Sequence, residues 1–152
     1  MNVGTIDGGL RPNVIAPTSR AVVDVRVATQ ADADRIEEAI HALQPKTEGV
    51  ALEIEGGMGR PPLEPTPRNQ ALWSMAKELG HGLGLELGEA RAGGGSDGNT
   101  TSLYTATLDG LGPVGDGAHA HHEQLNLDRT TERAALLGLL LMAPSIGSTQ
   151  HD

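Results

Sequence analysis

Aromatic side chains are almost absent from this chain, which contains no Phe, one Trp and one Tyr in 152 residues. A core without aromatic rings must be built from Leu, Val, Ile, Ala and Met, each of which buries less apolar area than a ring does. Hydrophobic residues make up 38% of the chain, and 21 residues are glycine, so the wider apolar fraction approaches that of an ordinary globular protein. We therefore expect one domain or two small ones, of modest stability.

The charge balance and the residue types exclude several classes of partner. The formal net charge of −9 argues against nucleic acid and anionic membranes, because both are bound through clustered Lys and Arg. The chain has no cysteine, so His, Asp and Glu are its only strong metal ligands. The longest apolar run, residues 134–143, is too short to span a membrane, and no secretory signal pattern follows Met1. We expect a cytoplasmic protein that does not associate with membranes.

The N-terminal part of the chain shows strand and helix periods in turn. Residues 20–27 and 50–55 alternate apolar and polar side chains, the pattern of a half-buried strand, and residues 2–6 could form a third strand. Thr29 provides a helix-capping signal, and the apolar residues after it recur at helical spacing until Pro45. The order strand, strand, helix, strand predicts a small α+β unit.

A Gly- and Pro-rich stretch, "GGMGRPPLEPTP" at residues 56–67, interrupts both periods and is the best candidate for a domain boundary. Beyond it, the pattern predicts a helix around residues 72–79 and possible strands at 85–90 and 107–111. The run at 130–142 is apolar nearly all round, which predicts a buried helix.

The glycine run "GGGSDGN" at residues 93–99 follows a possible strand and precedes a possible helix that starts at Asn99. Glycines let the backbone approach a ligand closely and present successive N–H groups to an anion. The run lacks the Lys of a phosphate-binding P-loop and the spacing of a dinucleotide fold. A carboxylate is the favoured ligand, and a flexible surface loop is the alternative.

The stretch "GDGAHAHHE" at residues 115–123 contains three of the six histidines and two carboxylates. Neutral imidazoles are good zinc ligands, but a catalytic zinc site needs three protein ligands, and no full set with a known spacing is present. Composition and spacing leave a metal ligand and an exposed polar loop equally open.

Two further residues could bind a carboxylate. Arg60 stands on a Pro-flanked turn that suits bidentate binding, and Asn13 can donate hydrogen bonds through its amide. Alternatively, Arg60 lies in a solvated loop and Asn13 caps a turn. No serine lies in a Gly-x-Ser-x-Gly elbow, so no serine hydrolase is indicated.

In this order, the motifs resemble the C-terminal half of a zinc-dependent aminoacyl hydrolase of the glutamate carboxypeptidase, acetylornithine deacetylase and succinyl-diaminopimelate desuccinylase family. The resemblance extends from Asn2 to about Met142. The motifs that carry it are "NVIAP", "DVRV", "GRP", "GGGSDGN" and "HAxxE". Each motif is weak singly, and the ordered set is specific.

The resemblance implies an α/β (α+β) fold in two parts. Residues 1–60 correspond to a partial ferredoxin-like lid or dimerisation domain, and residues 61–152 correspond to the C-terminal portion of an α/β zinc-hydrolase catalytic domain. Met1 falls where the second strand of the family's lid begins, so the lid's first strand and helix are expected to be missing.

The resemblance also assigns residues. His119 takes the position of the family's last zinc ligand, whereas His121 and Glu123 are candidates only for a rearranged site, and His122 has no family role. Arg26 matches a strand position that is structural. The residues that match substrate-carboxylate contacts are Asn13, Arg60, Gly94, Gly95 and Ser96.

The family's other zinc ligands and its general base lie upstream of the lid and have no counterpart in this chain. The resemblance therefore implies a chain that grips a carboxylate-bearing substrate, supplies one zinc ligand for hydrolysis of an N-acyl amino acid or a peptide bond, and is inactive alone. It would act with a second copy or with a missing N-terminal half. Two alternatives stay open: a catalytically dead lid-type dimerisation or binding module, and a rearranged small metal-dependent hydrolase with its site across a dimer.

Overall fold

The computed structural model describes residues 1–145, and the chain divides into two compact units, Met1–Met58 and Gly59–Asp152. The division falls inside the Gly- and Pro-rich stretch 56–67, where neither a helical nor a strand period continues. Helices and small antiparallel sheets confirm the predicted α+β class. The assignment of residues 1–60 to a lid and 61–152 to a catalytic domain stays a prediction.

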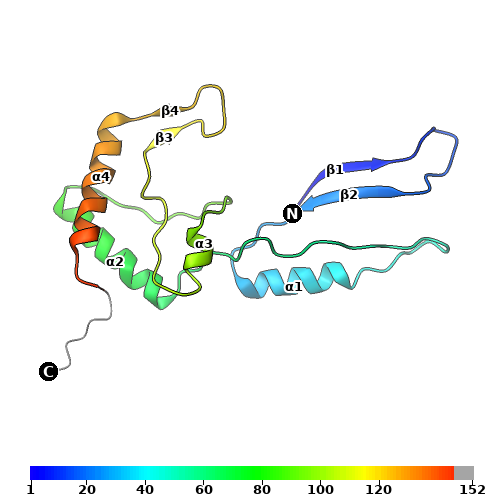
Figure 1. The fold of residues 1–152 in the computed structure, drawn as a ribbon, viewed down its shortest axis with the longest axis horizontal. Helices are drawn as coiled ribbons and strands as arrows, with labels where there is room; N and C mark the ends of the chain where they lie inside the picture. The colour runs from blue at the N-terminus through cyan, green and yellow to red at the C-terminus, as the bar shows by residue number, and fades with distance from the viewer. Residues whose placement is uncertain (146–152) are drawn as a thin grey trace. The chain divides into compact units, whose positions relative to one another are not determined.

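The first unit opens with a β-hairpin (Figure 1). Strand β1 (Asn2–Gly8) pairs antiparallel with β2 (Ser19–Asp24), with Ile6 opposite Ala21 and an irregularity between Val3 and Thr5. The predicted strand at residues 2–6 is confirmed and is slightly longer than expected.

The prediction of a half-buried strand at residues 20–27 is wrong in two respects. Strand β2 ends at Asp24, and every residue of both strands is exposed. Val22 and Val23, which point to opposite faces of the hairpin, are 50% and 42% exposed. Alternation predicts which side chains share a face, but burial requires a second layer, and no described element covers either face. Arg26, just past the strand, bonds Asp24 at 2.8 Å in an exposed ion pair.

Helix α1 (Gln30–His41) follows the hairpin and begins where the sequence predicts. The Thr29 hydroxyl accepts a hydrogen bond from the backbone N–H of Asp32 at 3.1 Å, which satisfies one of the free donors of the first turn. Ala33 is the buried residue of this helix, and Ile36 and Ile40 on the same stripe are half-buried. The amphipathic helix is therefore confirmed.

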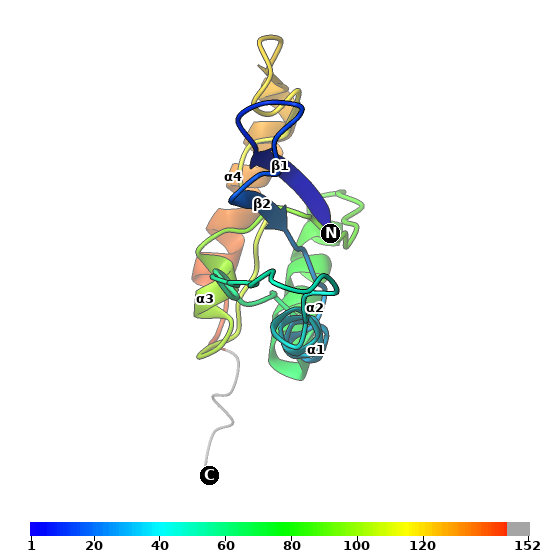
Figure 2. The ribbon, with the colours of Figure 1, turned by 90° about the vertical axis from the view of Figure 1, so that its right-hand side faces the viewer.

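Residues 50–55, predicted as a half-buried strand, form no strand in the structure. Val50 and Leu52 are about half exposed. A β-carbon on Gly57 would lie 2.8 Å from Glu37 Oε1, so the chain returns beside α1 (Figures 1 and 2). The prediction fails because a strand needs a neighbouring strand for its backbone hydrogen bonds, and the described part of this unit places none there.

The second unit is organised by two helices that pack together, α2 (Pro67–Gly82) and α4 (Leu127–Met142). Each has a side-chain N-cap: the Thr66 hydroxyl accepts from the N–H of Asn69 at 3.3 Å, and Asn126 Oδ1 accepts from the N–H of Arg129 at 2.9 Å. Ala76 in α2 and Leu136 in α4 are completely buried. The predicted helix around residues 72–79 is confirmed.

The C-terminal helix is present, but it is not the buried helix that its composition predicts. It starts at Leu127, and Leu136 is its only buried residue. Leu141 and Met142 are 79% and 84% exposed. One partner helix covers only one stripe of an all-round apolar helix, so the rest of its surface stays uncovered.

The possible strands at 85–90 and 107–111 are absent from the structure. The first segment runs along α2: Leu87 lies against Gly80, and Gln70 donates to Glu89 at 2.9 Å. In the second segment, the backbone N–H of Thr107 donates at 2.9 Å to the side chain of Asn69.

The remaining elements are short. Helix α3 (Gly98–Thr101) is a single turn, and strands β3 (Gly115–Asp116) and β4 (Gln124–Leu125) form a small hairpin before α4. Among the helices within residues 1–145, none is long and apolar enough to cross a membrane.

Candidate functional site

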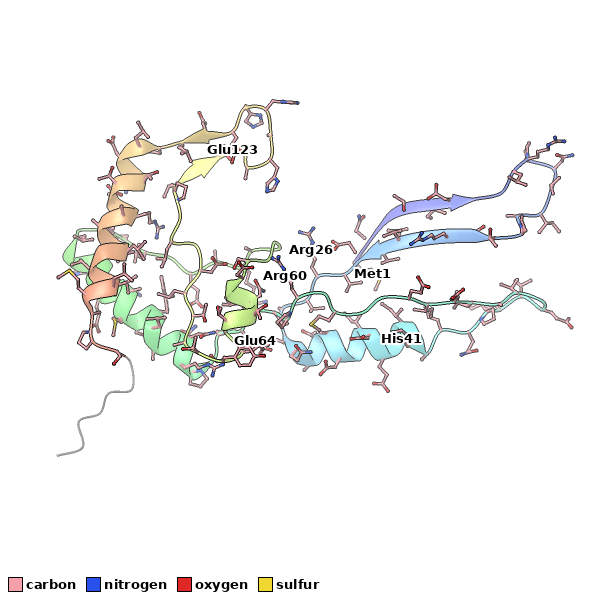
Figure 3. The ribbon with its side chains drawn as sticks, viewed as in Figure 1. Met1, Arg26, His41, Arg60, Glu64 and Glu123 are labelled. Atoms are coloured by element: carbon pink, nitrogen blue, oxygen red, sulfur yellow. The ribbon has the colours of Figure 1, made fainter. Side chains whose placement is uncertain are left out.

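The structure brings Arg60 and the glycine loop at residues 93–96 together in the second unit (Figure 3). A β-carbon placed on Gly95 would lie 3.2 Å from Arg60 Cδ and 3.5 Å from Arg60 Nη1. A side chain at this position would require the arginine to shift by a few tenths of an ångström. Glycine therefore allows the arginine side chain to rest directly on the loop.

Asn99 connects the two segments that form this site. Its Oδ1 atom accepts a hydrogen bond from the backbone N–H of Ser96 at 2.8 Å. Its Nδ2 atom donates to the backbone carbonyl of Pro61 at 2.9 Å. The sequence indicated Asn99 as the last residue of the glycine run and the start of a possible helix. Its three-residue distance from Ser96 is the one local signal that could have revealed the first of these bonds.

The Ser96 hydroxyl is used by the fold itself. It donates to Asp109 Oδ2 at 2.6 Å and accepts from the N–H of Gly98 at 3.0 Å. The N–H group of Ser96 is also engaged, by Asn99. A substrate contact of Ser96 stays a prediction. In the structure, its hydroxyl stabilises the loop through these two hydrogen bonds. Asp109 was missed by sequence reasoning.

The groups left available for a ligand are a guanidinium and backbone donors. Arg60 is exposed and forms no ion pair with any residue in the range 1–145. Over the same range, the N–H groups of Gly94 and Gly95 have no hydrogen-bond partner. A fork of guanidinium donors beside free backbone N–H groups suits a carboxylate, which accepts through two oxygens.

Asn13 is part of the other unit. It lies exposed in the loop between β1 and β2 of the first unit, whereas Arg60, Gly94, Gly95 and Ser96 all lie in the second. The substrate contact of Asn13 stays a prediction.

Residues 117–123 of the histidine-rich stretch form the loop of the β3–β4 hairpin, and Glu123 is the last residue of this loop, next to β4 (Figure 3). His119, His121, His122 and Glu123 are all exposed. His119 adopts a left-handed backbone conformation with φ of 67°, which is uncommon for a residue other than glycine. His122 lies against Gly117, where a β-carbon would be 2.8 Å from its Cδ2 atom. The contact gives His122 a structural position that the sequence did not indicate.

These residues do not by themselves make a zinc site. Within residues 1–145, no three His, Asp or Glu side chains are gathered so that they could hold a metal ion. A catalytic zinc needs about three protein ligands in closed geometry. His119 is thus a single exposed imidazole that can complete a site only with ligands from elsewhere, and its role stays a prediction.

Comparison with known proteins gives a family match for the first unit. Residues 1–48, which contain β1, β2 and α1, match the model of the M20 peptidase dimerisation domain. The match covers about a third of the chain and supports a relationship to peptidases of the M20 family. It is also compatible with a homodimer. No curated protein and no solved structure matches the chain.

Proposed function

We propose that this chain is the substrate-binding and metal-completing part of a zinc-dependent amidohydrolase or carboxypeptidase-like protein. The observation that carries the proposal is the position of Arg60, whose side chain rests on Gly95 with a guanidinium that has no ion-pair partner among the described residues. The match of residues 1–48 to a peptidase dimerisation domain supports the same family from the other unit.

In the proposed function, the guanidinium of Arg60 and the free N–H groups of Gly94 and Gly95 hold the carboxylate of an N-acyl amino acid or a peptide. Bidentate contacts fix the substrate's orientation as well as its charge. His119 contributes one ligand to a zinc ion, and the remaining ligands and the general base come from another chain. The chain is therefore inactive alone.

Carboxylate binding is tested by titrating the chain with N-acetylglycine. We expect Arg60→Ala to weaken binding by about tenfold, because one charge-assisted hydrogen-bonding group contributes about 1.5–3 kcal/mol and this site is exposed to solvent. Isothermal titration calorimetry measures the change. Arg60→Lys should recover only part of the affinity, since an ammonium lacks the planar fork.

The matched control is Arg129→Ala, which removes the same charge from an exposed pair with Glu132 in α4 and should leave binding unchanged. Neutral N-acetylglycinamide should not bind. Equal affinities for the acid and the amide, or an Arg60→Ala variant that binds as well as the parent, would show that the site does not recognise carboxylates.

A second candidate function is a catalytically dead dimerisation or binding module. The observation that favours this alternative is the family match, which lies in the dimerisation domain. This alternative requires neither the Arg60 site nor zinc. If the unmodified chain self-associates but does not bind N-acetylglycine, this alternative is supported.

Zinc titration distinguishes a chain that supplies one zinc ligand from a rearranged hydrolase whose zinc site lies across a dimer. We expect the purified chain to show no tight zinc binding, because one imidazole without partners holds the ion weakly. Calorimetry could instead show tight binding with one zinc for two chains, lost in His119→Ala and in His121→Ala. That result would support the rearranged small metal-dependent hydrolase with its site across a dimer. Zinc-dependent hydrolysis of an N-acyl amino acid by the chain alone would overturn the proposal that it is inactive by itself.

Self-association is the expected behaviour of the isolated chain. Both faces of the β1–β2 hairpin expose apolar side chains, including Ile6 at 74%, and uncovered sheet faces and edges favour pairing. Size-exclusion chromatography with light scattering should give a species heavier than the 15.8 kDa monomer. A monomer that persists at high protein concentration would contradict this expectation.

A further inference from the structure

We propose that Asn99 is a positioning residue that holds Arg60 over the glycine loop. Its amide bonds both segments at once, through the carbonyl of Pro61 on one side and the N–H of Ser96 on the other, at 2.9 and 2.8 Å. Pro61 adjoins Arg60, and Ser96 adjoins Gly95. One side chain therefore sets the distance between the two residues that meet in the site.

The two segments need such a connection because neither belongs to a helix or a strand. No ladder of backbone hydrogen bonds fixes their spacing, and a Gly-rich loop has the largest conformational entropy to lose on ordering. Without the amide, the Arg60 turn and the glycine loop would lose the two hydrogen bonds through which Asn99 joins them, and the guanidinium would sample more positions away from Gly95.

Asn99 is itself well anchored, so it can act as a fixed point. Its backbone N–H donates to the carbonyl of Ser96 at 3.2 Å, and its own carbonyl accepts from the Ser102 hydroxyl at 3.0 Å. Ser102 is buried, and its carbonyl accepts a hydrogen bond from Arg68 at the start of α2. The amide is therefore connected to the more regular part of the second unit.

The chemistry requires an amide at this position. A carboxamide of this length offers a donor and an acceptor on one flat group. Aspartate would lose the donor to Pro61, and alanine would lose both bonds. Serine could still accept from the N–H of Ser96, as hydroxyls do in short turns, but it is too short to reach Pro61.

The position of Arg60 is tested first, without any ligand. In NMR spectra of the full chain, we expect a nuclear Overhauser effect between the Arg60 Hδ and Gly95 Hα protons. It should disappear in Asn99→Ala and in Asn99→Ser, and the second variant should keep the protected Ser96 amide. The control is Thr100→Ala, which changes an exposed neighbour in α3 whose hydroxyl makes no described hydrogen bond. Persistence of the Arg60–Gly95 signal in both Asn99 variants would overturn the proposal.

The consequence for binding rests on the proposed function and is measured separately with N-acetylglycine. If Asn99 acts mainly through Arg60, Asn99→Ala should weaken binding several-fold in the parent but have a much smaller effect in an Arg60→Ala background. Additive losses would instead show that Asn99 contributes independently of Arg60, against the proposal. If the parent does not bind N-acetylglycine while the Overhauser signal behaves as expected, the proposed function fails and the positioning by Asn99 stands.

Discussion

Replacing Leu136 by alanine is expected to remove a large fraction of the stability of the second unit. Leu136 is the one large side chain in residues 1–145 that is fully buried. Leu→Ala substitutions in cores cost about 2–5 kcal/mol, through lost transfer energy and the cavity left behind. With no aromatic core to compensate, that loss is a large fraction of the stability of a small domain, which is about 5–15 kcal/mol. Urea denaturation followed by far-ultraviolet circular dichroism measures it.

The matched control is Leu141→Ala, the same change on the same helix at a position that is 79% exposed. It should shift the free energy of unfolding by no more than about 0.5 kcal/mol. Equal effects of the two substitutions would mean that the α2–α4 contact does not hold the unit together. A large effect of Leu141→Ala alone would mean that a partner covers the other side of α4.

Substituting Gly115 by alanine is expected to break the hairpin that carries His119. A β-carbon at this position would lie 2.2 Å from the backbone oxygen of Gln124, a separation that only a backbone shift can relieve. Because β3 and β4 have two residues each, a shift there removes their pairing. The N–H of Asn126, which donates to the carbonyl of Val114 at 2.8 Å, should then exchange with solvent at least about tenfold faster.

Gly112→Ala serves as the control, because a β-carbon at Gly112 meets no atom within 4 Å. Amide exchange at Asn126 should be unchanged in this variant. Unaltered exchange in Gly115→Ala would show that the hairpin is not formed in solution and that residues 115–123 are an irregular loop.

The helices and their caps could be predicted from sequence because they depend on neighbours in the chain. The Thr29 hydroxyl meets the N–H of Asp32 within one turn, as the sequence spacing indicates. The predictions of strands at 50–55, 85–90 and 107–111 are wrong, since alternation records only a preference for a pleated surface. Whether such a segment pairs depends on a distant partner, and at Thr107 the side chain of Asn69 supplies the acceptor instead.

Burial was predicted less well than secondary structure. The apolar run of α4 and the alternation of β2 both indicated covered surfaces, yet Leu141 and Val22 are exposed. An apolar face shows that a surface favours contact and does not show what contacts it.

In the candidate site, too, the residues of local motifs could be predicted and the long-range contacts could not. Arg60 and the loop of Gly94, Gly95 and Ser96 could be named from ordered motifs, and the structure brings Arg60 and Gly95 into contact. The residues that hold them there depend on contacts between distant segments. Asn99 bonds Pro61 across 38 residues and Asp109 bonds Ser96 across 13, and no spacing rule indicates either of these two bonds.

The uncovered β1–β2 hairpin has a thermodynamic consequence for the first unit. A two-stranded hairpin is at best marginally stable in water when nothing covers its faces. Any copy or partner that covers those faces stabilises the folded form by mass action. Folding of this unit and its assembly are then one equilibrium, and the fraction of folded chains depends on the concentration of the partner as well as on the amino-acid sequence.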